Sequence, residues 1–166
     1  MIRRLSVLLA LPLVLVGFAP NRAQAQKPKP PELVASTDPR TPDEERAGFR
    51  LPPGFEAQLV VSEPVINKPM NLAFDDRGRL WVTTSREYPF PDKEGGNAPR
   101  DRVVVLDDFG PDGKARKVTV FADGLNIPIG VLPLGDGSRA IVHSIPNVWL
   151  LTDDDGDGKA DRREVL

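Results

Sequence analysis

Residues 147–166 read NVWLLTDDDGDGKADRREVL, and the twelve positions from Asp153 to Glu164 match the pattern of a calcium-binding loop. Carboxylates stand at loop positions 1, 3, 5, 9 and 12, the arrangement that wraps oxygen ligands around one Ca²⁺. Gly158, at position 6, allows the sharp turn that this wrapping needs. The predicted ligands are the side chains of Asp153, Asp155, Asp157, Asp161 and Glu164, together with the backbone carbonyl of Lys159.

The flanks of this loop indicate strands rather than the helices of an EF-hand. Apolar residues 148–151 precede the loop and residues 164–166 follow it, which predicts a strand, a loop and a second strand. We therefore expect a β-hairpin loop that holds calcium in a structural role, with an affinity on the order of 10⁻⁴ to 10⁻³ M. The alternative is a solvated acidic turn that holds no ion. Mutual repulsion of five close carboxylates favours calcium.

An earlier segment repeats this one. Residues 102–121 match residues 147–166 at eight of twenty positions with an offset of 45. Only Asp108 and Asp112 keep acidic loop positions in the earlier copy, which is therefore predicted to be a turn without an ion. A weaker pairing aligns residues 67–85 with 126–144. Together they indicate a unit of about 45 to 60 residues, the size of a four-stranded propeller blade.

Short apolar runs separated by turn residues predict an all-β fold. The expected strands are 56–62, 70–75, 79–85, 102–107, 117–122, 129–134, 139–144, 147–152 and 163–166. They form one closing strand and about two four-stranded antiparallel blades, so residues 49–166 are predicted to be an incomplete β-propeller. Since propellers usually close with four or more blades, we expect an N-terminal fragment of a longer protein or a truncated gene product. The alternative is a small complete β-domain.

The N-terminal residues predict export. Residues 1–25 combine two early arginines, an apolar run and a small-residue cleavage site, which is typical of a signal peptide cleaved after Ala25. The mature protein is then secreted or periplasmic and has no membrane span. A membrane anchor is the alternative, but the apolar run is short for a span. Residues 26–48 are expected to form a proline-rich leader with a short helix from Thr41 to about Gly48.

Charge and cysteine content exclude several classes of function. Without residues 1–25 the chain has 19 basic and 24 acidic residues, which argues against a nucleic-acid partner. The chain has no cysteine, so disulfides, zinc–thiolate sites and covalently attached haem are excluded.

Several ordered motifs resemble the N-terminal β-propellers of membrane-bound dehydrogenases, which are related to the glucose/sorbosone dehydrogenase propellers. The motifs lie within residues 50–56, 62–64, 73–82, 86–89, 121–130 and 155–161. The resemblance implies an exported propeller that, in full-length relatives, precedes helical repeats and a c-type haem domain. Where the family usually places a glutamate after the tryptophan strand, this chain has Thr84 or Ser85.

Three hypotheses about function follow. The leading one is a calcium-stabilised propeller portion that serves as a scaffold or binding surface, for carbohydrate or for further domains of a longer parent. The second is part of a dehydrogenase that oxidises a sugar or alcohol with pyrroloquinoline quinone, with His143 as general base and Arg86 as anion clamp. A packed or solvent-facing histidine and an exposed loop arginine are the simpler interpretations. The third is an exported module that completes its sheet with a partner strand.

Overall fold

The computed structural model describes residues 38–89 and 99–166. The predicted signal peptide and the leader up to residue 37 lie outside the described residues. Every element below belongs to residues 39–166, which form one compact unit. In the described part, no helix has the length and apolar character needed to cross a membrane.

The short helix predicted at residue 41 is present as α1 (Pro42–Ala47). Its N-cap is Thr41, whose hydroxyl accepts a hydrogen bond from the Glu44 backbone at 3.3 Å. The Glu44 carboxylate accepts hydrogen bonds in return from the Thr41 backbone and from the Thr41 hydroxyl, each at 2.8 Å, and these two bonds hold the pKa of Glu44 below its usual value. No residue of α1 is buried, so the capping box rather than core packing supports this helix.

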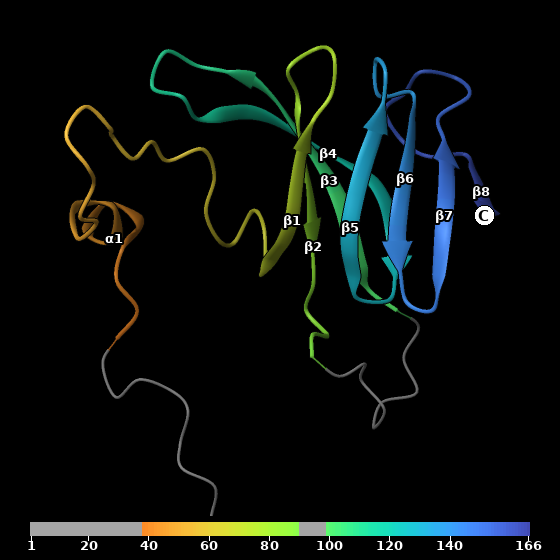
Figure 1. Ribbon diagram of the computed structural model, residues 1–166, viewed down its shortest axis with the longest axis horizontal. Coiled ribbons are helices and arrows are strands. Elements are labelled where there is room, and N and C mark those ends of the chain that lie inside the picture. The colour runs from red at the N-terminus through yellow and green to blue at the C-terminus, as the bar shows by residue number, and fades with distance from the viewer. Residues whose placement is uncertain (1–37, 90–98) are drawn as a thin grey trace, which may run out of the picture. The chain divides into compact units, whose positions relative to one another are not determined.

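Eight strands form two four-stranded antiparallel sheets, which confirms the all-β prediction (Figure 1). Sheet A has the order β1 (Pro69–Phe74), β2 (Leu80–Thr84), β3 (Asp101–Phe109) and β4 (Ala115–Leu125). Sheet B has the order β5 (Pro128–Leu134), β6 (Arg139–Ser144), β7 (Asn147–Thr152) and β8 (Arg162–Val165). Each sheet is therefore a meander in which chain neighbours are also hydrogen-bonded neighbours.

The strand predicted over residues 56–62 is wrong. This segment is irregular and meets the edge of sheet A through one backbone hydrogen bond, from Ala115 N to Val60 O at 3.0 Å. Its apolar residues pack on a face of sheet A instead of pairing along its edge. Val60 and Val61, together with Ile66 just after the segment, cover the side chains of Leu80, Val82, Val104 and Leu106. An apolar run of this kind can be buried by either route, and the sequence pattern does not distinguish them.

The main core lies between the two sheets. Trp81 is fully buried and meets Phe121 edge to face, with ring centroids 4.5 Å apart. Sheet B contributes four buried side chains, Val131, Ala140, Val142 and Leu151, and Trp149 packs against them half-buried. The run from Val103 to Leu106 is buried on both faces, as predicted for an inner strand.

The two sheets repeat one another pair by pair. Thr84 faces Arg102 in sheet A, and Ser144 faces Asn147 in sheet B. The third and fourth strands are related by the predicted offset of 45, because Leu106 faces Val118 and Leu151 faces Arg163.

The weaker sequence pairing, of 67–85 with 126–144, is right for the first strand of each sheet and one residue out for the second. An offset of 59 relates β1 to β5, and each strand has a register shift two residues after its first proline. The offset between β2 and β6 is 60, because Thr84 pairs with Pro69 while Ser144 pairs with Pro128. The turn between β5 and β6 is one residue longer than the turn between β1 and β2, and an alignment without gaps cannot show this difference.

Candidate binding pocket and acidic loop

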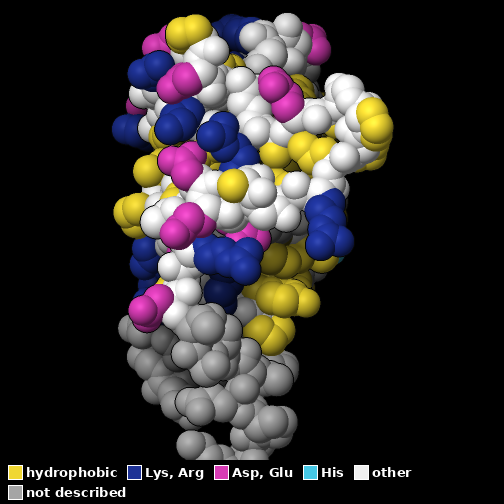
Figure 2. Space-filling model, turned by 90° about the vertical axis from the view of Figure 1, so that its left-hand side faces the viewer, with side chains coloured by type: hydrophobic (Ala, Val, Ile, Leu, Met, Phe, Trp, Pro, Cys, Tyr) yellow, Lys and Arg dark blue, Asp and Glu magenta, His cyan; other side chains and the backbone are white. Residues whose placement is uncertain are grey.

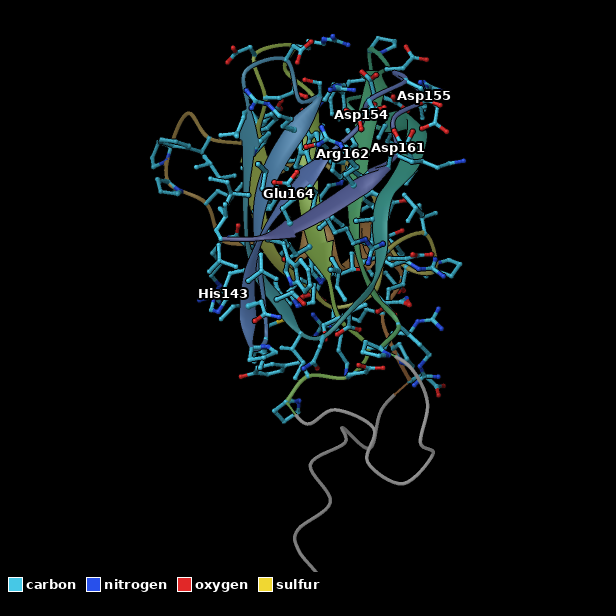
Figure 3. The ribbon with its side chains drawn as sticks, turned by 90° about the vertical axis from the view of Figure 1, so that its right-hand side faces the viewer. His143, Asp154, Asp155, Asp161, Arg162 and Glu164 are labelled. Atoms are coloured by element: carbon cyan, nitrogen blue, oxygen red, sulfur yellow. The ribbon has the colours of Figure 1, made fainter. Side chains whose placement is uncertain are left out.

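The acidic loop is a β-hairpin loop, as predicted, and joins β7 to β8 (Figure 3). Its backbone bends at Gly156 and Gly158, which have φ angles of 80° and 87°. The Asp153 carboxylate sits inside the bend and accepts hydrogen bonds from both glycine backbones, at 2.7 and 3.0 Å. The Asp161 carboxylate accepts one from Asp154 N at 2.8 Å. These bonds shape the loop around its own carboxylates.

Three of the predicted calcium ligands come together. Carboxylate oxygens of Asp153, Asp155 and Asp161 lie within 4.8 Å of one another. The other two predicted carboxylates point to basic partners. Asp157 forms an ion pair with Lys159 Nζ at 3.6 Å, and Glu164, on β8, is paired with Arg162 at 3.2 Å. The converging group consists of hard oxygen donors of the type that Ca²⁺ prefers.

Asp154 closes the loop at its base, a role that the calcium pattern does not predict. It pairs with Arg162 through two hydrogen bonds, from Nε at 2.5 Å and from Nη2 at 2.9 Å. This forked pairing lowers the pKa of Asp154 and raises that of Arg162. Loop position 2 carries no metal ligand in the pattern, so only the hairpin geometry reveals this pair.

The loop also joins the two sheets. Ala160 N donates a hydrogen bond to the carbonyl of Phe121, on β4 of sheet A, at 2.8 Å. Gly158 lies beside Thr119, where a Cβ atom would stand 3.3 Å from the threonine methyl group. The turn between β7 and β8 is therefore anchored on the neighbouring sheet.

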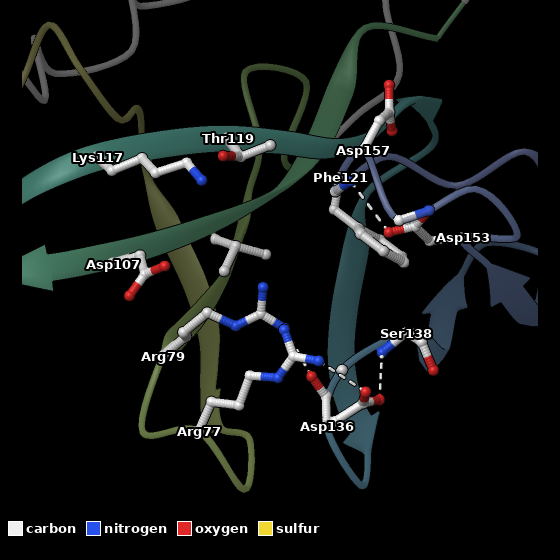
Figure 4. A pocket seen from close by; sticks show the side chains of 14 residues that line it. Arg77, Arg79, Asp107, Lys117, Thr119, Phe121, Asp136, Ser138, Asp153 and Asp157 are labelled. Atoms are coloured by element: carbon white, nitrogen blue, oxygen red, sulfur yellow. Dashed lines mark hydrogen bonds and ion pairs between the residues drawn. The ribbon is translucent and has the colours of Figure 1, made fainter.

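A pocket of about 420 Å³ opens between the sheets beside this loop (Figure 4). Seven charged side chains line it: Arg77, Arg79, Asp107, Lys117, Asp136, Asp153 and Asp157. Two hydroxyl groups, of Thr119 and Ser138, complete a wall that offers both donors and acceptors. The pocket thus suits a small ligand with many polar groups more than an apolar one.

A buried carboxylate, Asp75, holds the pocket residue Arg79 in place. It accepts hydrogen bonds from the backbones of Arg77 and Arg79, from Arg79 Nε at 2.7 Å and from Trp81 Nε1 at 2.9 Å. Burial opposes ionisation, but the bonds from Trp81 and Arg79 outweigh it and hold the pKa of Asp75 below 3.8. Asp75 is an ionised anchor for the arginines rather than a free acid or base.

Asp136, in the turn between β5 and β6, connects sheet B to this cluster. Its carboxylate accepts a hydrogen bond from Arg77 at 2.7 Å, and its carbonyl accepts one from Arg79 at 2.7 Å. Hydrogen bonds from Ser138, and then from Arg77, lower the pKa of Asp136. The next residue, Gly137, packs directly on Arg79, Asp75 and Trp81.

A second buried carboxylate, Asp101, lies at the start of β3 and is bound by the segment that connects the two sheets. Asp101 accepts hydrogen bonds from Ser85 Oγ at 2.7 Å, from Arg86 N at 2.6 Å and from Ile127 N at 3.0 Å. The sequence pattern singles out neither Asp75 nor Asp101 as a functional residue. An aspartate at a strand end beside an apolar run is the signal they share, but that signal is common in turns.

His143 and Arg86 belong to separate surroundings. Arg86 donates its Nε–H to Asn67 at 2.9 Å and borders a small pocket of about 80 Å³. His143 is exposed on β6, where it pairs with Gly130 and Val148. Within the described residues, no hydrogen bond or ion pair joins the two. A buried carboxylate does follow the tryptophan strand at Glu87, which is paired with Arg100 at 3.4 Å.

Fold and site together define an all-β protein of two repeated four-stranded sheets with a charged pocket between them. The chain belongs to the family described as "Domain of unknown function (DUF7133)", which matches residues 41–166. Neither the curated proteins nor the solved structures include a match to this chain.

Proposed function

We propose that this chain is an exported, calcium-stabilised β-propeller portion whose function is to bind a polar ligand, with carbohydrate as the ligand class. One observation carries the binding function: the charged pocket of about 420 Å³ that opens between the sheets beside the acidic loop. Sugars carry many hydroxyl groups that both donate and accept, and the wall offers carboxylates, cations and hydroxyls together. Export is supported by the signal-peptide pattern of residues 1–25.

The propeller is supported by the repeat of strand order and register between the two sheets and by their face-to-face core. Calcium is supported by the twelve-position pattern, in which Asp153, Asp155 and Asp161 would hold the ion by their carboxylates. Because the loop is anchored on Phe121, an ion bound there would stiffen the wall of the pocket.

The quinone-dependent dehydrogenase hypothesis has less support. It needs an acid–base group and an anion clamp around one cavity, and His143 and Arg86 have different partners among the described residues. Neither residue lines the larger pocket.

Calorimetric titration with CaCl₂ tests the ion. We expect binding by the wild type, loss of binding in Asp155→Ala, and unchanged binding in Asp112→Ala, which alters the matching turn of sheet A. At 10 mM Ca²⁺ the free energy of unfolding of the wild type should rise by about 1.4 to 2.7 kcal/mol for the affinity expected of such loops. Equal heats for the wild type and Asp155→Ala would remove calcium from the proposal.

Binding to an array of neutral and uronic-acid oligosaccharides tests the ligand class. Lys117→Ala, in the pocket wall, should lose any binding that the wild type shows, while Lys114→Ala, outside the pocket, should keep it. If the wild type retains no oligosaccharide with or without Ca²⁺, the carbohydrate proposal is refuted.

A further inference from the structure

A second, smaller pocket lies at the other end of sheet A from the charged pocket. It has a volume of about 80 Å³ and opens where β2 ends and β3 begins. Among the described residues that line it are three arginines, Arg86, Arg100 and Arg102, and one carboxylate, that of Asp101. We name this site the arginine pocket. Its described lining has an excess of positive charge.

The one carboxylate of this lining is already occupied by other donors. One oxygen of Asp101 accepts hydrogen bonds from Ser85 Oγ and Ile127 N, and the other accepts one from the backbone of Arg86. The side chain of Arg86 is held by a neutral group instead, because its Nε donates to Asn67 Oδ1 at 2.9 Å. Within the described residues, no hydrogen bond uses the two terminal nitrogens of this guanidinium. It is therefore fixed in place without a counter-ion.

Two of the three arginines differ from the other basic residues of the surface. The face of the molecule shown in Figure 2 has Lys and Arg side chains with Asp and Glu side chains among them. Most arginines in the described part of the chain pair with a carboxylate, and Arg100 does so with Glu87 at 3.4 Å. Over the same residues, Arg86 has no ion pair, and the Arg102 side chain has neither an ion pair nor a hydrogen bond.

The internal repeat shows that a sheet of this kind folds without these arginines. Arg102 corresponds to Asn147, because each is paired with the last residue of the preceding strand. Arg86 corresponds to Pro146, because each stands two residues after that strand. Sheet B therefore has an uncharged residue at both positions and forms the same meander. The two arginines are an addition to the architecture, which points to a role in binding.

The rest of the arginine pocket is mainly apolar. Ile66 and Val104 are buried in its wall, and Val118 and Val120 line it as well. Apolar walls strengthen the attraction between a cation and an anion, because little water is present to screen it. A volume of this size holds a few waters or one small polyatomic ion. Size and charge together suit a small anion.

We propose that the arginine pocket binds a tetrahedral oxyanion, namely a phosphate or sulfate group, as a free ion or as an ester on a larger molecule. Guanidinium groups present N–H donors in a planar fork that matches the oxygens of such a group. A tetrahedral group has more oxygens than a carboxylate has, so it can accept from several arginines at once. The inference does not depend on calcium or carbohydrate, because the arginine pocket shares no lining residue with the charged pocket.

Calorimetric titration in Tris chloride buffer tests the proposal with three probes: sodium phosphate, sodium sulfate and glucose 6-phosphate. The wild type should bind at least one of them. Arg86→Gln and Arg102→Gln should each weaken that binding by about tenfold or more, because each removes a charged donor. Arg139→Gln removes an exposed arginine outside the pocket and should bind like the wild type. Circular dichroism would establish that each variant is folded.

The three probes also separate the two sources of the oxyanion. Binding of inorganic phosphate or sulfate assigns the pocket to a free ion, whereas binding of glucose 6-phosphate alone assigns it to an ester group. Either result supports the proposal if the binding depends on Arg86 and Arg102. A wild type that binds none of the probes overturns it. So does binding that Arg86→Gln and Arg102→Gln leave unchanged, because the anion would then lie outside the arginine pocket.

Discussion

Gly137 provides the sharpest test of how the two sheets are packed. This residue lies in the turn between β5 and β6 with a φ of 75°. A Cβ atom there would stand 2.5 Å from Arg79 Nη2, 2.6 Å from Asp75 Oδ2 and 2.9 Å from Trp81 Cζ2. Gly78, in the corresponding turn of sheet A, also has a φ of 75° but no heavy atom within 4 Å of its Cβ position. The two glycines therefore share the backbone cost of substitution and differ only in what surrounds them.

We expect Gly78→Ala to lower the free energy of unfolding by about 1–2 kcal/mol, the cost of a left-handed alanine. Gly137→Ala should lose that amount and about 1–3 kcal/mol more, because the methyl group displaces the Asp75–Arg79 pair and the Trp81 ring. Urea unfolding followed by tryptophan fluorescence measures both. A loss of about 2 kcal/mol moves the urea midpoint by roughly 1 M for an m-value near 2 kcal/mol/M. Equal losses of unfolding free energy for the two variants would contradict the close packing of the Gly137 turn against sheet A.

Two further predictions concern the buried carboxylates. The pKa of Asp75 is lowered in the folded protein, so its contribution to stability is present above pH 3.8 and is lost as the pH falls through the lowered pKa. Asp75→Asn should therefore cost about 2–3 kcal/mol at pH 7, and urea unfolding should show this deficit shrinking below about pH 4. Asp101→Asn should cost about 1–3 kcal/mol in the same assay, because its amide group cannot accept all three hydrogen bonds. Asp123→Asn, exposed on β4, should change stability by less than about 0.5 kcal/mol, and a similar loss there would contradict the role given to Asp101.

Local patterns in the sequence predicted much of the secondary structure because they depend on neighbouring residues. The capping residues Thr41 and Glu44 predicted α1, and the repeat of 102–121 in 147–166 predicted that both segments are the third hairpin of a sheet. The segment 56–62 was misassigned because its apolar residues are buried on a sheet face without forming a ladder. The one-residue shift between β2 and β6 was also missed, since turn length is not visible in an ungapped pairing.

The candidate site, too, could be predicted from the sequence only in part. Its acidic loop was visible in the sequence, because the ligand pattern is contained in twelve consecutive residues. The pocket was not, since it joins Arg77 and Arg79 of one sheet to Asp136 and Asp153 of the other. Such a combination depends on how the sheets pack.

The sequence alone thus determined the strand-rich repeat and the bend at Gly158, because hydrogen bonding, chirality and alternation act over a few residues. Only the tertiary structure decided which face of each sheet is covered. A sheet has two faces. The docking of sheet B decides that Trp81 packs in the same core as Val142 rather than facing solvent. Tertiary structure also sets the role of Asp101, because its donor Ile127 N belongs to the connection that leads to sheet B and lies 26 residues away in the chain.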